Sequence, residues 1–156
     1  FLTVPSLALF ALFIPLVGIG NTPAIIALVL YAILPILRNT VTGLDSVDGA
    51  VIESAKGMGL NGTQRLLRVR LPLAWPVIMA GIRVSSLLTV GIAAIAVLVG
   101  GDGLGRFIQD GLTRLGLPNS AESLWTGTVF IVLLGLVLDL LFALVQRLTT
   151  SRGLRL

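Results

Sequence analysis

Four long apolar runs, separated by shorter polar stretches, organise this sequence. They occupy residues 2–19, 22–37, 74–99 and 124–145. A helix that crosses a bilayer needs about 20 apolar residues, so the third and fourth runs are predicted to span a membrane. The first two runs are shorter, and by length alone either could be a re-entrant or a buried segment. The turn at 18–23 contains two glycines and a proline and suits a tight connection between two antiparallel helices.

The polar stretch at 45–72 contains local signals for short helices. Asp48 is placed to cap a helix that begins at Gly49. Gly59 stands where the C-terminus of that helix needs a left-handed residue, and Leu60 follows as the apolar contact of a Schellman-type stop. The stretch is therefore predicted to begin with a short helix that ends in a tight turn at Gly59.

A second short helix is predicted after this turn. Asn61 and Gln64 have the spacing of a capping box, and Pro72 is expected to begin the next transmembrane helix. Two short helices at an angle fixed by Gly59 would form a rigid, half-apolar projection, which suggests a docking element for a soluble partner. The alternative is an ordinary amphipathic loop that lies on the lipid surface.

The composition places the chain in the class of integral membrane proteins. Of its 156 residues, 56% are hydrophobic and 12% are charged, whereas about a quarter of the residues of a soluble domain are charged. A soluble fold of this size could not bury so much apolar surface. We therefore expect an all-α membrane protein with residues 1–156 in one domain. Because the chain starts inside an apolar run without Met, we also expect a further N-terminal helix.

The lack of cysteine and histidine in the sequence excludes several kinds of chemistry. It removes disulfides, thiol nucleophiles, the usual zinc ligands and any Ser-His-Asp triad. The stretch at 101–105 lacks the Gly-Lys-Ser/Thr of a phosphate-binding loop, and the G-x-G-x-x-G pattern at 57–62 has no strand before it. We expect no catalytic residue, no metal site and no cofactor, and hence no ATP hydrolysis by this chain.

Basic residues flank the apolar runs, which indicates topology rather than nucleic-acid binding. The stretch between the second and third runs holds Arg38, Lys56, Arg65, Arg68 and Arg70, and the end of the chain holds Arg147, Arg152 and Arg155. The two arginines at 100–123 are offset by Asp102, Asp110 and Glu122. Because cytoplasmic loops are rich in Lys and Arg, residues 38–73 and the C-terminus are expected in the cytoplasm, and residues 100–123 outside.

A twenty-residue motif gives the polar stretch a more specific interpretation. Glu53-Ser54-Ala55, three residues, Gly59, nine residues and Val69-Arg70-Leu71-Pro72 resemble the EAA motif of the permease subunits of ATP-binding-cassette (ABC) importers. Ser54 and Val69 stand where the family pattern has Ala and Ile, and the spacing is intact. The segments at 4–10, 27–40 and 100–105 resemble the osmoprotectant branch, whose cargo includes glycine betaine, choline, carnitine and proline. The last apolar run resembles the last helix of this branch only in its apolar character, not in its residues.

The resemblance implies a type I ABC importer transmembrane domain in the bacterial inner membrane. Four helices and the cytoplasmic coupling helices of such a domain would lie in this chain. Two permease subunits, identical or paralogous, would assemble with two ATP-binding subunits on the cytoplasmic side and an external substrate-binding protein. By this resemblance the coupling loop is 45–72; its turn comprises Glu53, Ser54, Ala55 and Gly59, and Leu71 and Pro72 join it to the next transmembrane helix.

Two other functions stay open at this point. One is a permease for amino acids, because the permease helices of such importers are often less selective than the binding protein. The other is an ion-coupled secondary transporter, a class that usually carries intramembrane acidic or histidine residues. Here only Arg83 and Asp139 lie inside apolar runs.

These two charged residues are predicted to form an ion pair within the membrane. Arg83 follows Pro72 by eleven residues and Asp139 precedes Arg147 by eight, so both lie roughly 12–16 Å from the cytoplasmic boundary at 1.5 Å per residue. Pairing would lower the cost of a charge at that depth. The alternative is that Arg83 reaches towards the interface while Asp139 is protonated or faces water.

Three hydroxylated residues in the third run are candidates for the translocation pathway. They are Ser85, Ser86 and Thr89, in the helix that by resemblance lines the subunit interface. Small and hydroxylated residues in a membrane helix also serve helix packing, so packing is the alternative role.

Overall fold

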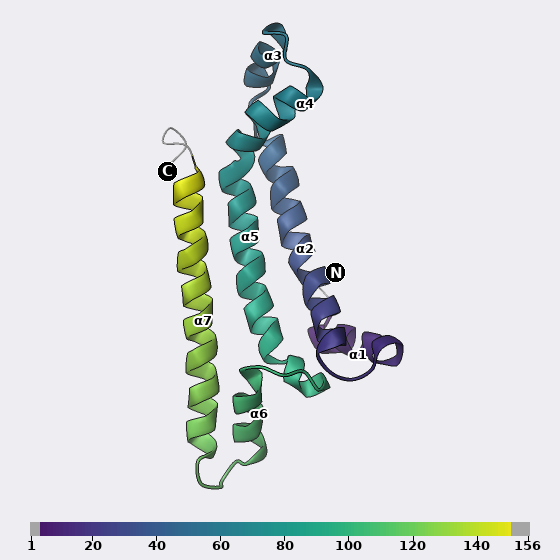
Figure 1. The fold of residues 1–156 in the computed structure, drawn as a ribbon, viewed down its shortest axis with the longest axis vertical. Helices are drawn as coiled ribbons and strands as arrows, with labels where there is room; N and C mark the ends of the chain where they lie inside the picture. Colours follow the sequence, from purple (N-terminus) through teal and green to yellow (C-terminus); the bar gives the residue numbers. More distant parts are fainter. Residues whose placement is uncertain (1–3, 151–156) are drawn as a thin grey trace.

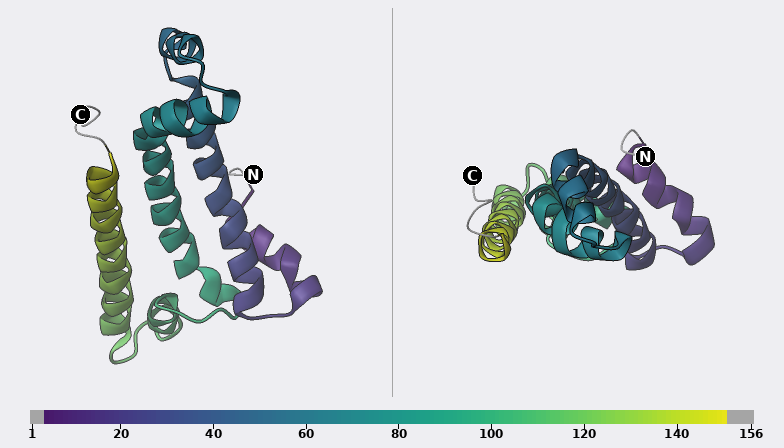
Figure 2. Two further views of the ribbon diagram at one scale, coloured as in Figure 1. Left: turned by 45° about the horizontal axis from the view of Figure 1, so that its top comes forward. Right: turned by 90° about the horizontal axis from the view of Figure 1, so that it is seen from above.

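The structure, a computed structural model, describes residues 4–150 as helices joined by short turns, with no strand in that range. Three long helices lie side by side: α2 (Asn21–Asp45), α5 (Leu71–Ala94) and α7 (Ser120–Thr149). Successive long helices run in opposite directions, and α5 lies between the other two (Figure 1). Viewed along the long axis, the helices form one row rather than a closed bundle (Figure 2).

The three long helical stretches are long and apolar enough to cross a membrane. The first, α2, was expected to end near residue 37, and this expectation is wrong, because the helix continues to Asp45. The polar residues that follow are compatible with a helix. Asn39 Nδ2 donates to Pro35 O (2.9 Å) and Thr40 Oγ1 donates to Ile36 O (2.7 Å), so both side chains find partners in the preceding turn.

The first apolar run is shorter than a membrane span. It forms α1 (Ser6–Val17), a helix of 12 residues with Pro15 inside it, which crosses the end of α2 (Figure 2). Its buried residues meet α2 and η2 (Ala96–Val99), a short 3-10 helix, in a cluster of Leu9, Phe10, Ala24, Ala27, Tyr31, Ala96 and Val99. The Tyr31 hydroxyl donates a hydrogen bond to the Val4 carbonyl. This cluster fixes the end of the molecule opposite the polar loop.

The third and fourth apolar runs also differ from their expected limits. The third was expected to be helical to residue 99, but α5 ends at Ala94 and η2 follows it. The stretch at 100–123 was expected to be a loop, yet it contains α6 (Gly105–Thr113), which packs against α7. The helix α7 begins before the apolar run and ends after it. Polar residues therefore extend the helices at both membrane boundaries.

Small residues bring α2 and α5 close together. A Cβ atom added to Gly43 would lie 3.1 Å from Val77 Cβ, and one added to Gly81 would lie 2.5 Å from Asn39 Cβ. Ser85, which is 2% exposed, donates from its hydroxyl to Ala32 O at 2.8 Å across the same contact. Close approach of backbones at small residues is the usual way in which membrane helices associate, so α2 and α5 form one packed unit.

Some expectations lie outside the described residues. They are the start of the first run at Leu2 and the positions of Arg152 and Arg155 in the C-terminal segment.

Two glycines of α5 offer a matched test of this packing. We expect Gly81→Ala to lower the stability of the purified protein by about 1–3 kcal/mol, because the new methyl group would overlap Asn39. Gly91→Ala should be neutral or slightly stabilising, since nothing lies within 4 Å of its added Cβ and alanine favours helices. Thermal unfolding in detergent measures both. If the two variants unfolded at the same midpoint temperature, this result would contradict the close packing of α2 and α5.

Candidate functional site

The polar loop projects beyond the ends of the long helices as a separate helical knob (Figures 1 and 2). It starts with α3 (Gly49–Gly57), whose first turn is capped as predicted, because Ala50 N donates to Asp48 Oδ1 at 2.9 Å. The cap satisfies a backbone donor that the first turn of a helix leaves unpaired. The first short helix of the loop is therefore specified by its own sequence.

The end of α3 has the predicted left-handed stop. Gly59 has φ +82°, a conformation that costs other residues about 1–2 kcal/mol. Its amide donates to Lys56 O at 3.0 Å, and Leu60 N donates to Ala55 O at 3.2 Å. These two bonds are those of a Schellman motif, and they turn the chain sharply into the second half of the loop.

The predicted capping box is also present. Gln64 N donates to Asn61 Oδ1 and Asn61 N donates to Gln64 Oε1, both at 2.9 Å. The helix that follows, α4 (Gly62–Arg65), was expected to be a separate short helix, and this expectation is wrong. Helical backbone continues from Gly62 through η1 (Leu66–Arg70), a π-helical turn, into α5, so that 33 residues form one helix to Ala94.

The π-helical turn has a local cause. Pro72 lacks an N–H, and its ring would collide with the carbonyl four residues earlier in a regular α-helix. In η1 the Leu71 amide donates to Leu66 O, five residues back, and this wider turn directly precedes the proline. Pro72 lies in the first turn of α5, as expected, but it is inside a continuous helix rather than at the start of one.

The residues of the motif divide into buried and exposed positions. Ala55 is 1% exposed, on a helix that contacts both α4 and η1. Glu53 and Ser54 are exposed, and the Ser54 hydroxyl donates to Ala50 O at 2.8 Å. Apolar side chains share the outer surface: Val51, Met58 and Leu67 are 41%, 72% and 57% exposed. The knob thus presents a mixed apolar and charged surface on a rigid support, which suits a protein partner.

An arginine that the sequence did not single out joins the base of the knob to α2. Arg70 Nη2 donates to Leu44 O at 2.9 Å and lies 3.7 Å from Asp45 Oδ1. Both partners are the last residues of α2, where helix carbonyls lack intrahelical partners and attract cations. Finding this contact from sequence would require knowing that α2 extends to Asp45.

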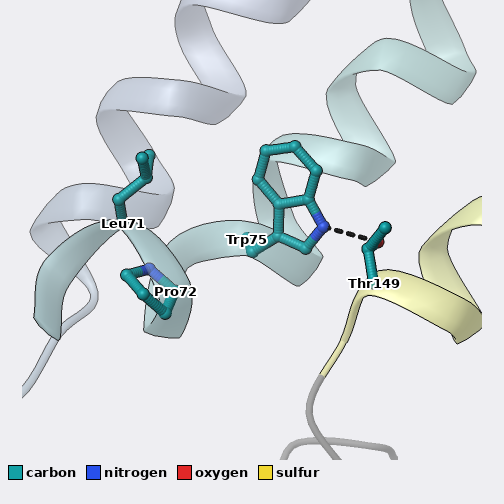
Figure 3. Close-up of a pocket in the computed structure, with 4 residues that line it drawn as sticks. All are labelled: Leu71, Pro72, Trp75 and Thr149. Atoms are coloured by element: carbon teal, nitrogen blue, oxygen red, sulfur yellow. Dashed lines mark hydrogen bonds between the residues drawn. The ribbon is translucent and has the colours of Figure 1, made fainter. Parts of the chain in front are cut away.

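The end of α7 covers the junction between the loop and α5. Leu71, Pro72, Trp75 and Thr149 line a pocket of about 270 Å³ (Figure 3). Trp75 Nε1 donates to Thr149 Oγ1 at 2.7 Å, and Gln146 Nε2 donates to Pro76 O at 3.4 Å. These bonds hold the end of α7 beside the first turns of α5.

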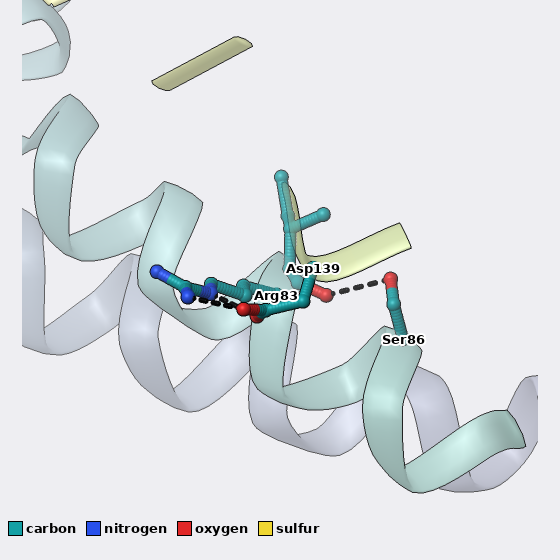
Figure 4. A network of polar contacts seen from close by, with 4 residues as sticks. Arg83, Ser86 and Asp139 are labelled. Carbon is teal, nitrogen blue, oxygen red and sulfur yellow. Dashed lines mark hydrogen bonds and ion pairs between the residues drawn. The ribbon is translucent and has the colours of Figure 1, made fainter. Parts of the chain in front are cut away.

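Arg83 and Asp139 form the predicted ion pair between α5 and α7 (Figure 4). Arg83 Nε donates to Asp139 Oδ1, and Arg83 Nη2 donates to Asp139 Oδ2 at 2.5 Å. Two parallel bonds of this kind make the strong form of an arginine–carboxylate pair. The same contact would hold α7 at a fixed height along α5.

The three hydroxylated candidates for the pathway are bonded within the subunit. Ser85 is buried against α2 and donates to Ala32 O, a contact that favours the packing alternative for it. Ser86 donates to Ile82 O at 2.9 Å and Thr89 donates to Ser85 O at 2.8 Å, both within α5. For Ser86 and Thr89, which are half-buried, the pathway role stays a prediction.

Comparison with known proteins decides the class. Residues 1–151 match the family described as the binding-protein-dependent transport system inner membrane component. The chain belongs to this family. It is therefore a permease domain of an inner-membrane ABC importer. Permease subunits of this kind are non-catalytic and work with a separate ATPase and a substrate-binding protein, so the ion-coupled transporter is excluded.

Individual relatives narrow the branch. The glycine betaine/carnitine/choline permease OpuCB of Bacillus subtilis is 44% identical over 98% of this chain and 69% of its own length. The osmoprotectant import permease OsmW of Salmonella typhimurium is 42% identical over 99% of this chain and 72% of its own length. Among solved structures, the inward-facing MetNI methionine ABC transporter aligns with 96% of this chain and 70% of the solved chain, with TM-score 0.81 and 27% identity.

Two arginines of η1 allow a test of the contact with α2. We expect Arg70→Met to raise hydrogen exchange at the end of α2 by about fivefold, because losing the bond to Leu44 O removes about 1 kcal/mol of local stability. Arg68→Met is the control, since Arg68 is exposed and has no hydrogen bond or ion pair within residues 4–150. Mass spectrometry of peptides covering residues 40–48 reports the exchange, and unchanged rates in Arg70→Met would show that this contact does not hold α2.

Proposed function

We propose that this chain is the permease subunit of an ATP-driven importer for osmoprotectants, namely the quaternary amines glycine betaine, choline and carnitine, together with proline. The observation that carries the proposal is the identity of 42–44% over nearly the whole chain to permeases whose names give glycine betaine, carnitine and choline, choline alone, or osmoprotectants. The methionine transporter has the same fold at 27% identity. Because one fold serves different cargoes, the nearer identity favours the osmoprotectants over amino acids.

The knob formed by α3 and α4 is the coupling element in this proposal. Two ATP-binding subunits would bind from the cytoplasm, one on the knob of this chain and one on that of a second permease, identical or paralogous. An external binding protein would deliver the solute at the opposite face. The basic residues of the loop and of the C-terminal segment support a cytoplasmic position for both, and the mixed outer surface of α3 supports docking of a protein.

The continuity of the helix explains how a movement of the ATPase would reach the membrane. A displacement of the knob acts on a helical stretch that continues from Gly62 to Ala94, although it bends between α4 and α5 (Figure 2). Arg70 attaches the end of α2 to the same stretch, and the small-residue contact holds α2 along its length. We therefore expect α2 and α5 to move as one body. The contacts of Trp75 and Arg83 with α7 should make α7 move with them.

Uptake measurements test the cargo. The complete importer, with its ATPase and binding protein in vesicles, should take up labelled glycine betaine only when ATP is supplied. Methionine, which lacks a quaternary ammonium group and is not among the proposed solutes, serves as the comparison. ATP-driven uptake of methionine, without uptake of glycine betaine, would replace the osmoprotectant assignment by the amino-acid alternative.

Two substitutions in the loop test the coupling role. Gly59→Val should strain the left-handed turn by about 1–2 kcal/mol and misplace α3, and Glu53→Ala should remove an exposed charge from the docking surface. Both variants should reach the membrane, yet uptake and the stimulation of the ATPase by loaded binding protein should fall together, by tenfold or more.

Matched controls separate docking from general damage. Gly116→Val changes a glycine between α6 and α7 that has the same left-handed conformation, with φ +85° and open space around it, and Glu122→Ala removes an exposed carboxylate at the other end of the molecule. Both should keep near-normal uptake. If Gly59→Val and Glu53→Ala behave like these controls, residues 53–72 are an interfacial loop and not a coupling element.

A further inference from the structure

The ion pair between Arg83 and Asp139 stands apart from the other charges on the long helices. Arg38, Asp45, Glu122 and Arg147 all lie within about two turns of a helix end. Arg83 lies at the middle of α5, and Asp139 lies well inside α7. Ionisable residues at such depth are rare in membrane helices and usually mark a route for a polar solute or ion.

The pair is accessible from one side. The side chains of Arg83 and Asp139 are 39% and 24% exposed, and they lie at the wall of an open groove of about 500 Å³ between α5 and α7. The remaining walls are apolar and comprise Val84, Leu87, Val132, Gly135 and Leu136. Within residues 4–150, the Nη1 atom of Arg83 has no hydrogen-bond partner. The groove therefore offers a free donor beside an exposed pair of opposite charges.

The charges in this groove are complementary to a zwitterion. A solute carboxylate would accept two hydrogen bonds from the guanidinium group, as carboxylates do from arginine. A quaternary ammonium carries methyl groups and no N–H, so it suits apolar walls with one carboxylate nearby. The volume lies within the range of about 300–1,000 Å³ for small-molecule sites. If lipid tails filled the groove instead, they would offer the exposed ion pair no hydrogen bond and no opposite charge.

We propose that Arg83 and Asp139 form a transient binding site for the zwitterionic solute inside the membrane, in which the ion pair opens and each side chain binds the opposite charge of the solute. The proposal rests on the osmoprotectant function above and adds the residues that recognise the cargo. Binding the solute would form two new ion pairs, but it would also break the pair between Arg83 and Asp139. Because the new contacts are offset by the lost one, the affinity for the solute should be low. A transport site must bind well enough to admit the solute and weakly enough to release it.

Comparing two solutes tests this site in the complete importer. Glycine betaine carries a carboxylate and a quaternary ammonium, whereas choline carries only the ammonium. Arg83→Gln should reduce glycine betaine uptake at least tenfold and choline uptake much less, while Asp139→Asn should reduce both. Arg106→Gln is the control, because Arg106 pairs with Asp102 on the surface outside the groove, and neither solute should be affected.

Protection of an engineered cysteine gives a second readout that does not depend on transport. The chain has no cysteine, so Val132→Cys places one thiol in the groove. Val137→Cys is the matched control on the same helix, since the two valines are 55% and 58% exposed and Val137 does not line the groove. Glycine betaine should slow maleimide labelling at residue 132 several-fold, leave residue 137 unchanged, and give no protection once Arg83→Gln is added.

The outcomes that overturn this inference differ from those that overturn the function. The pair would have only a structural role if Arg83→Gln reduced the uptake of both solutes equally and the double exchange Arg83→Asp with Asp139→Arg restored the uptake of both. Absence of protection at residue 132 in the otherwise unaltered chain overturns the site even if Arg83→Gln fails to assemble. A wild-type importer that carries no quaternary amine would instead contradict the proposed function.

Discussion

The contact between α2 and α5 is the interaction on which the other features of this molecule depend. It is made where glycine and serine let the two backbones approach, at Gly43, Gly81 and Ser85. Lipid tails are as apolar as the side chains, so hydrophobic burial gives little drive to such an association, and close packing with interhelical hydrogen bonds takes its place. Because the two helices flank the polar loop, their contact also fixes the distance between its two ends.

The helix α5 links the features at its two sides and at its end. Its N-terminal extension forms half of the knob, its middle contributes Arg83, and its C-terminal end leads through η2 into the cluster around Phe10 and Tyr31. A rotation or tilt of α5 would therefore change the position of the knob and the geometry of the ion pair at the same time. This gives a physical reason for a coupling loop and a solute site to share one helix.

How far the sequence predicts the structure depends on the range of the interaction. The caps at Asp48, Gly59 and Asn61 could be predicted because each involves residues at most five positions apart. The pairing of Arg83 with Asp139 could be predicted despite a separation of 56 positions, because few other partners exist for a charge at that depth. The motif with intact spacing predicted the family, which the comparisons confirm.

Other features could not be predicted, because they depend on how the helices are rotated and where they end. Ser85 looks the same in sequence whether it faces a pathway or a neighbour, and only the position of Ala32 shows that it packs against α2. Arg70 has a partner because α2 continues past its apolar run. The role of Arg70 could therefore be predicted only if the end of α2 were known. The π-helical turn before Pro72 likewise depends on continuity between the loop and α5. A proline motif at the junction suggests a break in the helix, whereas the wider turn lets the helix pass through it and keep the knob rigidly attached.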